Sequence, residues 1–198
     1  SAGAFLMGSA EGDGSADEGP QHRLSLDAFR IGAYPITNGQ YARFVAAASH
    51  PPPPHWEGTT PPPWLENHPV VGVSWHDARA SSRWRSESEG ITYRLPSEAE
   101  WEKAARGSDG RSYPWGDDWD PSRCNSSEGR GDWTTTPVGM YSVGVSPFGC
   151  QDIAGNVWEW TQSLWGKDWQ GPEYGYPYDP ADGRENLAAP DAVLRVLR

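Results

Sequence analysis

The pattern of apolar and polar positions predicts short strands in the first half of the chain. Residues 4–9 are mostly apolar and end in Gly-Ser, and residues 22–29 alternate polar with apolar side chains. Alternation with a period of two is typical of a strand that has one face buried. Residues 68–73, His-Pro-Val-Val-Gly-Val, form a further apolar run. We therefore expect strands over these three segments.

Three helices are predicted from signals at their first residues. A Ser or Thr followed three residues later by Gln, Asp or Glu has the spacing of a capping box. The chain has this spacing at Thr37 and Gln40, at Ser74 and Asp77, and at Ser97 and Glu100. We expect the second helix to run toward Gly90 and the third to span Glu98 to Arg106 before Gly107, because glycine readily ends a helix. Glu98, Glu100 and Glu102 are interpreted as acidic residues that favour the dipole of the third helix.

Long segments without periodicity separate these elements. Residues 51–54 and 61–63 include two proline clusters, in which neither a helix nor a central strand can persist. Residues 166–186 are rich in Gly, Pro, Tyr and Asp, which predicts an irregular loop whose aromatic side chains could line a binding surface. The 23 glycines and 19 prolines of the chain agree with a loop-rich fold.

Composition narrows the range of partners. The 198 residues carry a formal net charge of -11 with a pI near 4.8, and the mean hydropathy is -0.75. An acidic surface gains nothing from counterion release on nucleic acid or from an anionic lipid surface, so we expect no nucleic acid and no membrane as a partner. The partner that remains is a protein or a small-molecule ligand. The 12 Trp, 8 Tyr and 4 Phe supply apolar surface for a core, while two cysteines are too few to indicate a compartment.

The most informative segment is residues 152–161, Asp-Ile-Ala-Gly-Asn-Val-Trp-Glu-Trp-Thr. It places the oxygen-bearing side chains of Asp152, Asn156 and Glu159 among apolar and indole groups, with Gly155 where a tight bend would fall. Hard cations such as Ca²⁺ prefer several oxygen ligands, some from carboxylates and some from backbone carbonyls. A buried turn whose polar side chains bond its own backbone is an equal alternative at this point.

Further motifs follow one another between about residues 4 and 165. They include Phe5-Leu6-Met7-Gly8-Ser9, Tyr34-Pro35-Ile36-Thr37-Asn38, His68-Pro69-Val70-Val71-Gly72-Val73-Ser74-Trp75, Arg94-Leu95-Pro96-Ser97-Glu98-Ala99-Glu100-Trp101-Glu102, Tyr113-Pro114-Trp115-Gly116, Thr136-Pro137-Val138-Gly139, Ser146-Pro147-Phe148-Gly149 and Gly155-Asn156-Val157-Trp158-Glu159-Trp160. In this order, the motifs closely resemble those of the formylglycine-generating enzyme family, also called the sulfatase-modifying factor family.

The resemblance implies an α+β fold of the C-type-lectin-like kind, loop-rich, with short strands and about three helices. It implies a single domain over residues 1–198, and a structural Ca²⁺ held around the last motif. By that match, Asp152 and Glu159 would give side-chain oxygens, while Gly155 and Val157 would give backbone carbonyls. Family members often have Asn where Asp152 stands, and either side chain offers an oxygen.

Two other metal sites of related proteins are not expected. Asn125-Ser126 resembles half of a second calcium site of the family, but its partner motif is not recognisable around residues 131–133. A nonhaem iron site, as in related sulfoxide synthases, takes its histidines largely from a separate helical domain that this chain lacks. We expect His68 and His76 to form hydrogen bonds within the fold instead.

Catalysis is the part of the family's function that the sequence supports least. Family enzymes that oxidise a sulfatase cysteine to formylglycine carry a reactive cysteine pair in a C-terminal segment, after a strand similar to residues 193–198. The chain stops at Arg198, so we expect it to lack that segment. Cys124 and Cys150 do not match the catalytic positions, and whether they pair is open. We expect Cys150 to be a small buried residue, and no catalytic residue is assigned.

Two hypotheses for the function follow from the resemblance. In the first, the chain is a non-catalytic, calcium-stabilised scaffold that binds or displays a ligand, as in the variable proteins of diversity-generating retroelements. In the second, it is part of a copper-dependent oxidase that converts a sulfatase cysteine to formylglycine, with its catalytic cysteines beyond Arg198. Copper belongs only to the second hypothesis. Two details favour the first: the second calcium motif is unrecognisable, and the segment from Ser126 to Trp133 is short where the family would have a longer, aromatic stretch.

Overall fold

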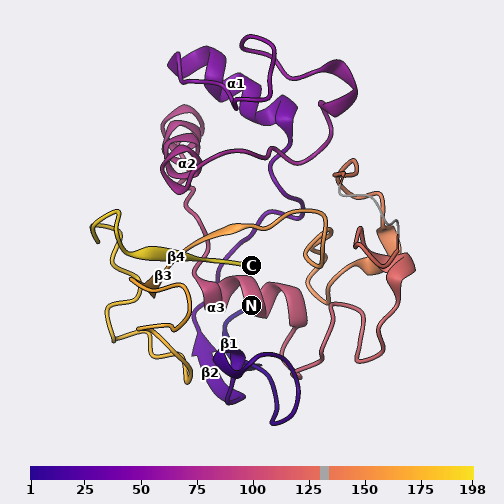
Figure 1. Ribbon diagram of the computed structural model, residues 1–198, viewed down its shortest axis with the longest axis vertical. Coiled ribbons are helices and arrows are strands. Elements are labelled where there is room, and N and C mark those ends of the chain that lie inside the picture. Colours follow the sequence, from indigo (N-terminus) through magenta and orange to yellow (C-terminus); the bar gives the residue numbers. More distant parts are fainter. Residues whose placement is uncertain (130–133) are drawn as a thin grey trace.

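The structure is a computed structural model that describes residues 1–129 and 134–198. Within these residues the helices are α1 (Asn38–Ala48), α2 (Trp75–Glu89) and α3 (Glu98–Arg106), and the strands are β1 (Gly3–Met7), β2 (His22–Leu26), β3 (Trp160–Gly166) and β4 (Leu194–Leu197). Short 3-10 helices span Ala16–Glu18, Pro63–Leu65, Pro121–Arg123 and Ser142–Gly144. Figure 1 shows α3 near the centre, with α1 and α2 at one end and the β1–β2 pair at the other. The predicted loop-rich α+β fold is confirmed.

The three helices begin at the predicted capping boxes. Thr37 Oγ1 accepts a hydrogen bond from Gln40 N at 3.2 Å, and Gln40 Oε1 accepts one from Thr37 N at 3.0 Å. The other two boxes, at the starts of α2 and α3, are formed in the same way. Gly90 follows α2 in the left-handed conformation and Gly107 follows α3, so the predicted ends of both helices are confirmed.

Helix α3 joins two buried clusters because it is apolar on more than one side. On one side Ala99 joins a buried cluster with Phe5, Met7 and Tyr178. On another side Ala104 and Ala105 join a cluster with Cys150 and Ile153, at the start of the 152–161 segment. Alanine side chains let the helix approach its neighbours closely, so α3 sets the position of that segment relative to the first sheet.

A separate cluster holds α1 and α2 together. Its buried members are Tyr41, Phe44, Val45 and Trp56, with Trp84 of α2 packed against them. Trp56 comes from the proline-rich loop, and its Nε1 donates to Asn38 Oδ1 at 3.2 Å. That contact ties the loop to the start of α1. Trp64 lies farther along the same loop and is 75% exposed.

The two sheets are both antiparallel pairs. β1 and β2 pair regularly from Gly3 opposite Leu26 to Met7 opposite His22. β3 and β4 begin with Trp160 opposite Leu197 and then shift register at irregularities. No helix among the described residues is both long enough and apolar enough to span a bilayer.

The strand predicted over residues 68–73 is wrong. The segment forms one isolated bridge, between Pro69 and Thr37. The Asn38 side-chain amide takes up the carbonyls of His68 and Pro69, at 3.1 and 3.2 Å, and Gly72 then turns the chain with φ of 71°. The backbone of this apolar run therefore bonds the side chain at the start of α1, and it does not pair with a neighbouring strand.

The loop over residues 166–186 is irregular as predicted, but most of its aromatic side chains do not form an exposed surface. Tyr178 is 5% exposed and belongs to the core, and Tyr176 is half-buried against α3. Trp169 is exposed. The aromatic residues of this loop anchor it to the rest of the fold, because their rings bury more apolar area than any other side chains.

The capping box of α3 gives a pH-dependent prediction. Arg94 donates to both Glu100 oxygens, at 2.6 and 2.7 Å. Although burial opposes ionisation, these bonds and those from Ser97 hold the pKa of Glu100 below its ordinary value. The ionised carboxylate therefore stabilises the fold above the unfolded-state pKa, and this contribution is lost as the pH falls through the folded-state pKa.

Glu100→Gln keeps a side chain that can complete the capping box but removes the ion pair with Arg94. We expect the variant to lose about 0.5–1 kcal/mol of unfolding free energy at pH 7 and less at pH 3, where Glu100 is closer to its folded-state pKa. Urea unfolding at the two pH values measures the difference. An equal loss at both would assign the effect to packing.

Candidate metal site

The 152–161 segment is shaped by residues in the left-handed backbone region. The φ values are 55° at Asp152, 93° at Gly155 and 67° at Asn156. Non-glycine residues rarely adopt such angles, and Asp and Asn are among the side chains that tolerate them. At Gly155 a Cβ atom would lie 2.4 Å from Asn125 O, so only glycine fits. The predicted tight bend at Gly155 is confirmed.

Asn156 fixes this turn through both ends of its amide. Its Oδ1 accepts from Thr136 N at 2.9 Å and from Asn125 Nδ2 at 3.2 Å, and its Nδ2 donates to Thr136 O at 3.2 Å. Its side chain is thus held by Asn125 and Thr136, which lie in an earlier segment of the same chain. The backbone groups that Asn156 bonds belong to Thr136, so this side chain anchors the loop to a distant segment and does not bond the loop's own backbone.

Asp152 and Glu159 behave differently. An Asp152 oxygen accepts from Gly139 N, and Glu159 Oε2 accepts from Trp101 Nε1 at 3.1 Å, which leaves the second oxygen of each carboxylate without a partner among the described residues. Burial raises the pKa of both groups, to about 7 for Glu159, where the charge of Asp152 adds to the rise. Neither carboxylate forms an ion pair within the described part of the chain. Asp152 is buried and Glu159 is partly exposed, and the two carboxylates repel each other without a counter-charge, a cost that a cation between them would remove.

The donors in this loop suit a hard cation. Besides the two carboxylates, the loop offers the carbonyls of Gly155 and Val157, and the Gly155 carbonyl, which accepts from Val157 N at 2.9 Å, keeps a second lone pair. The described residues contain no group of three or more His, Cys, Asp and Glu that could hold a metal. A cation here would therefore depend on backbone carbonyls as well as side chains, and calcium accepts such mixed oxygen ligands. The assignment of these four ligands stays a prediction.

A cavity of about 390 Å³ adjoins this loop. Its walls include Ala154, Gly155 and Val157 from the loop, together with Trp101 and Arg198. Trp158 stands beside it with 77% of its surface exposed. An exposed indole next to a cavity is a feature of binding surfaces.

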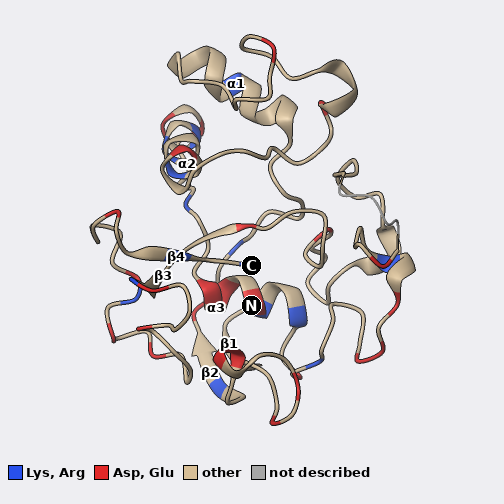
Figure 2. Ribbon diagram, viewed as in Figure 1, with Lys and Arg blue, Asp and Glu red and all other residues tan. Residues whose placement is uncertain are grey.

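A buried charged cluster lies on the other side of Trp101, and the sequence did not indicate it. Glu102 of α3 is 3% exposed and lies between two arginines: Arg106 Nη1 at 2.7 Å and Arg198 Nη2 at 2.8 Å. Gly8 N donates to it at 2.6 Å and the Tyr176 hydroxyl at 3.2 Å. In Figure 2 the first turn of α3 is acidic and its last turn is basic, which is the charge pattern of a solvent-exposed helix. The pattern therefore gives no sign that Glu102 is buried.

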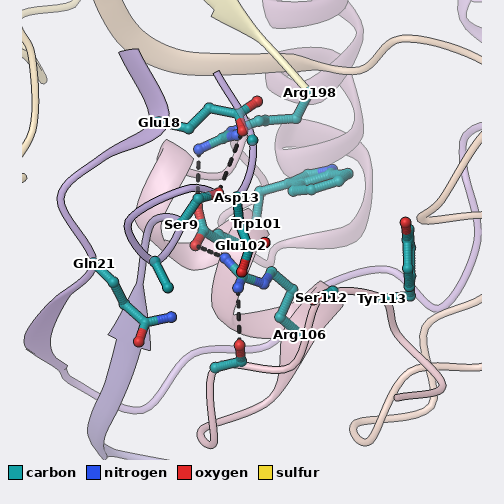
Figure 3. Close-up of a pocket in the computed structure, with 13 residues that line it drawn as sticks. Ser9, Asp13, Glu18, Gln21, Trp101, Glu102, Arg106, Ser112, Tyr113 and Arg198 are labelled. Atoms are coloured by element: carbon teal, nitrogen blue, oxygen red, sulfur yellow. Dashed lines mark hydrogen bonds and ion pairs between the residues drawn. The ribbon is translucent and has the colours of Figure 1, made fainter. Parts of the chain in front are cut away.

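The cluster forms one wall of a second cavity, also about 390 Å³. Figure 3 shows Glu102 between Arg198 and Arg106, with Tyr113 at the far side. The charged groups of the cluster form ion pairs with one another. The cluster therefore joins α3, the end of β1 and the end of β4 into one unit. Glu98 belongs to it as well, through Arg198 Nη2 at 2.8 Å. Glu98 and Glu102 therefore hold Arg198 as well, a role that their place near the start of α3 did not indicate.

The thiols and histidines are where the sequence led us to expect them. Cys124 and Cys150 are unpaired and buried, and burial raises the pKa of each thiol. A reactive or copper-binding cysteine needs a thiolate, so neither environment suits that role. His68 Nδ1 lies 2.9 Å from Thr135 Oγ1 and His76 Nε2 lies 3.0 Å from Asp191 Oδ1, which confirms that both histidines bond within the fold.

The second calcium site that we did not expect can be followed only in part. Asn125 is buried, and its Nδ2 donates to Thr134 O at 2.8 Å as well as to Asn156. Its side-chain amide is therefore engaged in holding the 152–161 segment. Residues 131–133, where the partner motif would lie, are outside the described residues.

A loop-rich α+β fold with three helices and short antiparallel strands is the class that the described residues define. A family model described as "Sulfatase-modifying factor enzyme 1-like domain" matches residues 1–194. The solved structure of PvdO from Pseudomonas aeruginosa is similar, with a TM-score of 0.72 and 27% identity over 89% of this chain and 74% of that one. The chain belongs to the sulfatase-modifying factor, or formylglycine-generating enzyme, family.

Its relatives differ in what they are named for. The chain is 36% identical over 214 residues to the serine/threonine-protein kinase Pkn1 of Chlamydia trachomatis, and the match spans 99% of this chain but 31% of the kinase. It is 34% identical to the formylglycine-generating enzyme of Streptomyces coelicolor, over 87% of this chain and 68% of that enzyme. It is 31% identical to the inactive C-alpha-formylglycine-generating enzyme 2 of Mus musculus, over 94% of this chain and 76% of that protein. The family therefore includes catalytic and non-catalytic members.

Proposed function

We propose that this chain is a non-catalytic, calcium-stabilised domain that binds or displays a ligand. The observation that carries the calcium part is the pair of neighbouring carboxylates, the buried Asp152 and the partly exposed Glu159, whose pKa values are both raised and which have no counter-charge among the described residues. Calcium would supply the missing charge and join the two ends of the loop, with the carbonyls of Gly155 and Val157 as further ligands. Its role would be structural.

The non-catalytic part rests on the thiols. Oxidation of a sulfatase cysteine to formylglycine is the activity that the family resemblance associates with a reactive cysteine pair. The cysteines at hand are unpaired, buried and raised in pKa. The similarity to a protein named as inactive supports the same reading. We also propose that the partner is a protein or a small molecule, and neither nucleic acid nor a membrane, because the net charge of the chain is -11.

The alternative is a copper-dependent oxidase that makes formylglycine in a sulfatase. The 34% identity to the Streptomyces coelicolor enzyme favours it. Because this alternative has its catalytic cysteines beyond Arg198, a sulfatase-motif peptide is incubated with copper, oxygen and the protein encoded by the full reading frame, with mass spectrometry as the readout. We expect the peptide cysteine to stay unmodified. Its conversion to formylglycine would establish the oxidase and remove the scaffold proposal.

Calcium is expected to raise the melting temperature of the chain, and Glu159→Ala is expected to remove most of that gain. Stabilisation follows the ratio of free ligand to dissociation constant, about 2.7 kcal/mol at a hundredfold excess. Differential scanning fluorimetry in calcium and in chelator measures it. The matched control is Glu87→Ala, which removes an exposed glutamate of α2 and should leave the calcium shift intact. Identical melting curves of the wild type in calcium and in chelator would remove the calcium proposal.

A further inference from the structure

Two guanidinium groups converge on one indole where α2 meets β4. The Cζ atom of Arg79 lies 4.5 Å from the centroid of the Trp75 ring, and that of Arg195 lies 4.0 Å from the same centroid. The two Cζ atoms are therefore at most 4.5 plus 4.0 Å apart. Both side chains are partly exposed. Two like charges at this separation repel each other, so the protein holds them together at a cost.

The protein fixes the orientation of both groups without using a carboxylate. Arg195 Nη1 donates to Gln162 O at 2.7 Å, and Arg79 Nη1 donates to Leu187 O at 3.3 Å. Trp75 is itself locked, because its Nε1 donates to Thr161 O at 2.9 Å and the ring is buried. The two guanidinium groups thus rest on a rigid ring and on backbone carbonyls, which pre-organises them.

The charges of Glu185 and Asp191 act on Arg195, but no carboxylate in the described part of the chain bonds either guanidinium. Neither Arg79 nor Arg195 forms an ion pair there, although Arg83 and Arg85 on the same helix pair with Glu87 and Glu89. Burial, followed by the charge of Arg79, lowers the pKa of Arg195. In a chain with a net charge of -11, two adjacent guanidinium groups without an ion-pair partner are unusual, and an acidic ligand would explain them.

Most of the hydrogen-bonding capacity of the pair is unused. A guanidinium carries five N–H donors, and the described residues accept one hydrogen bond from each of these two groups. Planar donors of this kind match the two oxygens of a carboxylate. Leu187, whose carbonyl accepts from Arg79, is 41% exposed, and Leu194, the neighbour of Arg195 in β4, is 40% exposed. A ligand that fits must therefore combine a carboxylate with apolar groups.

We propose that Arg79 and Arg195 form a docking site for a carboxylate side chain in an acidic, leucine-containing segment of a partner protein. A phosphate group fits less well, because Glu185 and Asp191 lie within electrostatic range of Arg195 and would repel a dianion more strongly than a single carboxylate. The exposed leucines would stay uncovered by a small free anion. None of these residues belongs to the candidate metal loop, so the inference does not depend on the calcium proposal.

The test is fluorescence anisotropy with the labelled peptide Leu-Glu-Glu-Leu-Glu-Glu and its counterpart in which Gln replaces each Glu. We expect the Glu peptide to bind and about 0.5 M NaCl to weaken it. Arg79→Gln and Arg195→Gln are each expected to weaken binding about tenfold, the loss of a charge-assisted hydrogen bond. The matched control Arg83→Gln removes the same charge from the same helix and should leave binding unchanged. If Arg195→Gln lowers the melting temperature of the chain, the test rests on the peptide affinity of Arg79→Gln alone.

Three results would overturn the inference. The first is equal affinity for the Glu and Gln peptides, or no binding of either. The second is a loss in Arg83→Gln as large as that in Arg79→Gln, which would indicate general charge attraction. The third is stronger competition by inorganic phosphate than by glutamate at equal concentration, which would assign the site to phosphate. Glu159→Ala should bind the peptide as the wild type does, so that the calcium proposal can fail without affecting this result.

Discussion

Glu102→Ala is expected to lower the free energy of unfolding by about 3–5 kcal/mol, because it leaves Arg106 without its carboxylate partner and Arg198 with Glu98 alone in a largely buried cluster. Glu102 is 3% exposed and accepts hydrogen bonds from both Arg106 and Arg198 as well as from Gly8 N. Without the carboxylate, two guanidinium groups would lose their shared acceptor inside the protein. The same change would separate β1, α3 and the end of β4, which the cluster joins.

Urea unfolding in the presence of calcium measures this effect. Glu87→Ala is the matched control: it also removes a glutamate that pairs with an arginine four residues away, but both side chains are exposed. We expect it to cost less than about 0.5 kcal/mol. A loss below about 1 kcal/mol for Glu102→Ala would mean that water replaces the carboxylate and that the cluster does not hold these elements together.

Gly155→Ala is expected to cost about 3–5 kcal/mol and to abolish the response to calcium. The added Cβ would lie 2.4 Å from Asn125 O, and the backbone at this residue has φ of 93°. The first effect forces the loop away from residue 125, and the second strains any residue other than glycine. Because the loop carries the predicted calcium ligands on both sides of this position, its displacement should separate them.

Gly183→Ala separates the two causes. Gly183 has a φ of 92°, nearly the same as Gly155, but nothing lies within 4 Å of its added Cβ. The control therefore carries the backbone strain alone, about 1–2 kcal/mol, and should keep the calcium response. Melting curves of both variants with calcium and with chelator give the comparison. Equal losses in the two variants would show that contact with Asn125 does not shape the loop.

Local signals in the sequence predicted the helices well. Each capping box, such as Ser97 with Glu100, involves residues three apart and needs no knowledge of the rest of the fold. The strand predicted over residues 68–73 was wrong because the carbonyls of His68 and Pro69 bond the side chain of Asn38, about thirty residues away. An apolar run records that a segment is buried and leaves open which groups satisfy its backbone.

The candidate site shows the same division. The turn at Gly155 could be predicted because glycine and oxygen-bearing side chains lie together in sequence. The cluster around Glu102 could not, because Gly8, Arg198 and Tyr176 reach it from distant segments. On a helix wheel Glu102 is simply another charged position. Its burial depends on the strand and loop that cover α3, and no periodicity encodes them.

Calorimetric titration of the chelator-treated chain with CaCl₂ tests the central claim most directly. The account predicts one Ca²⁺ per chain, retained in Asp152→Asn, which keeps a side-chain oxygen, and lost in Glu159→Ala. Circular dichroism of Glu159→Ala must show the wild-type spectrum for the loss to count. Absence of binding to the wild type, or binding that Glu159→Ala leaves unchanged, would contradict the assignment of calcium to this loop.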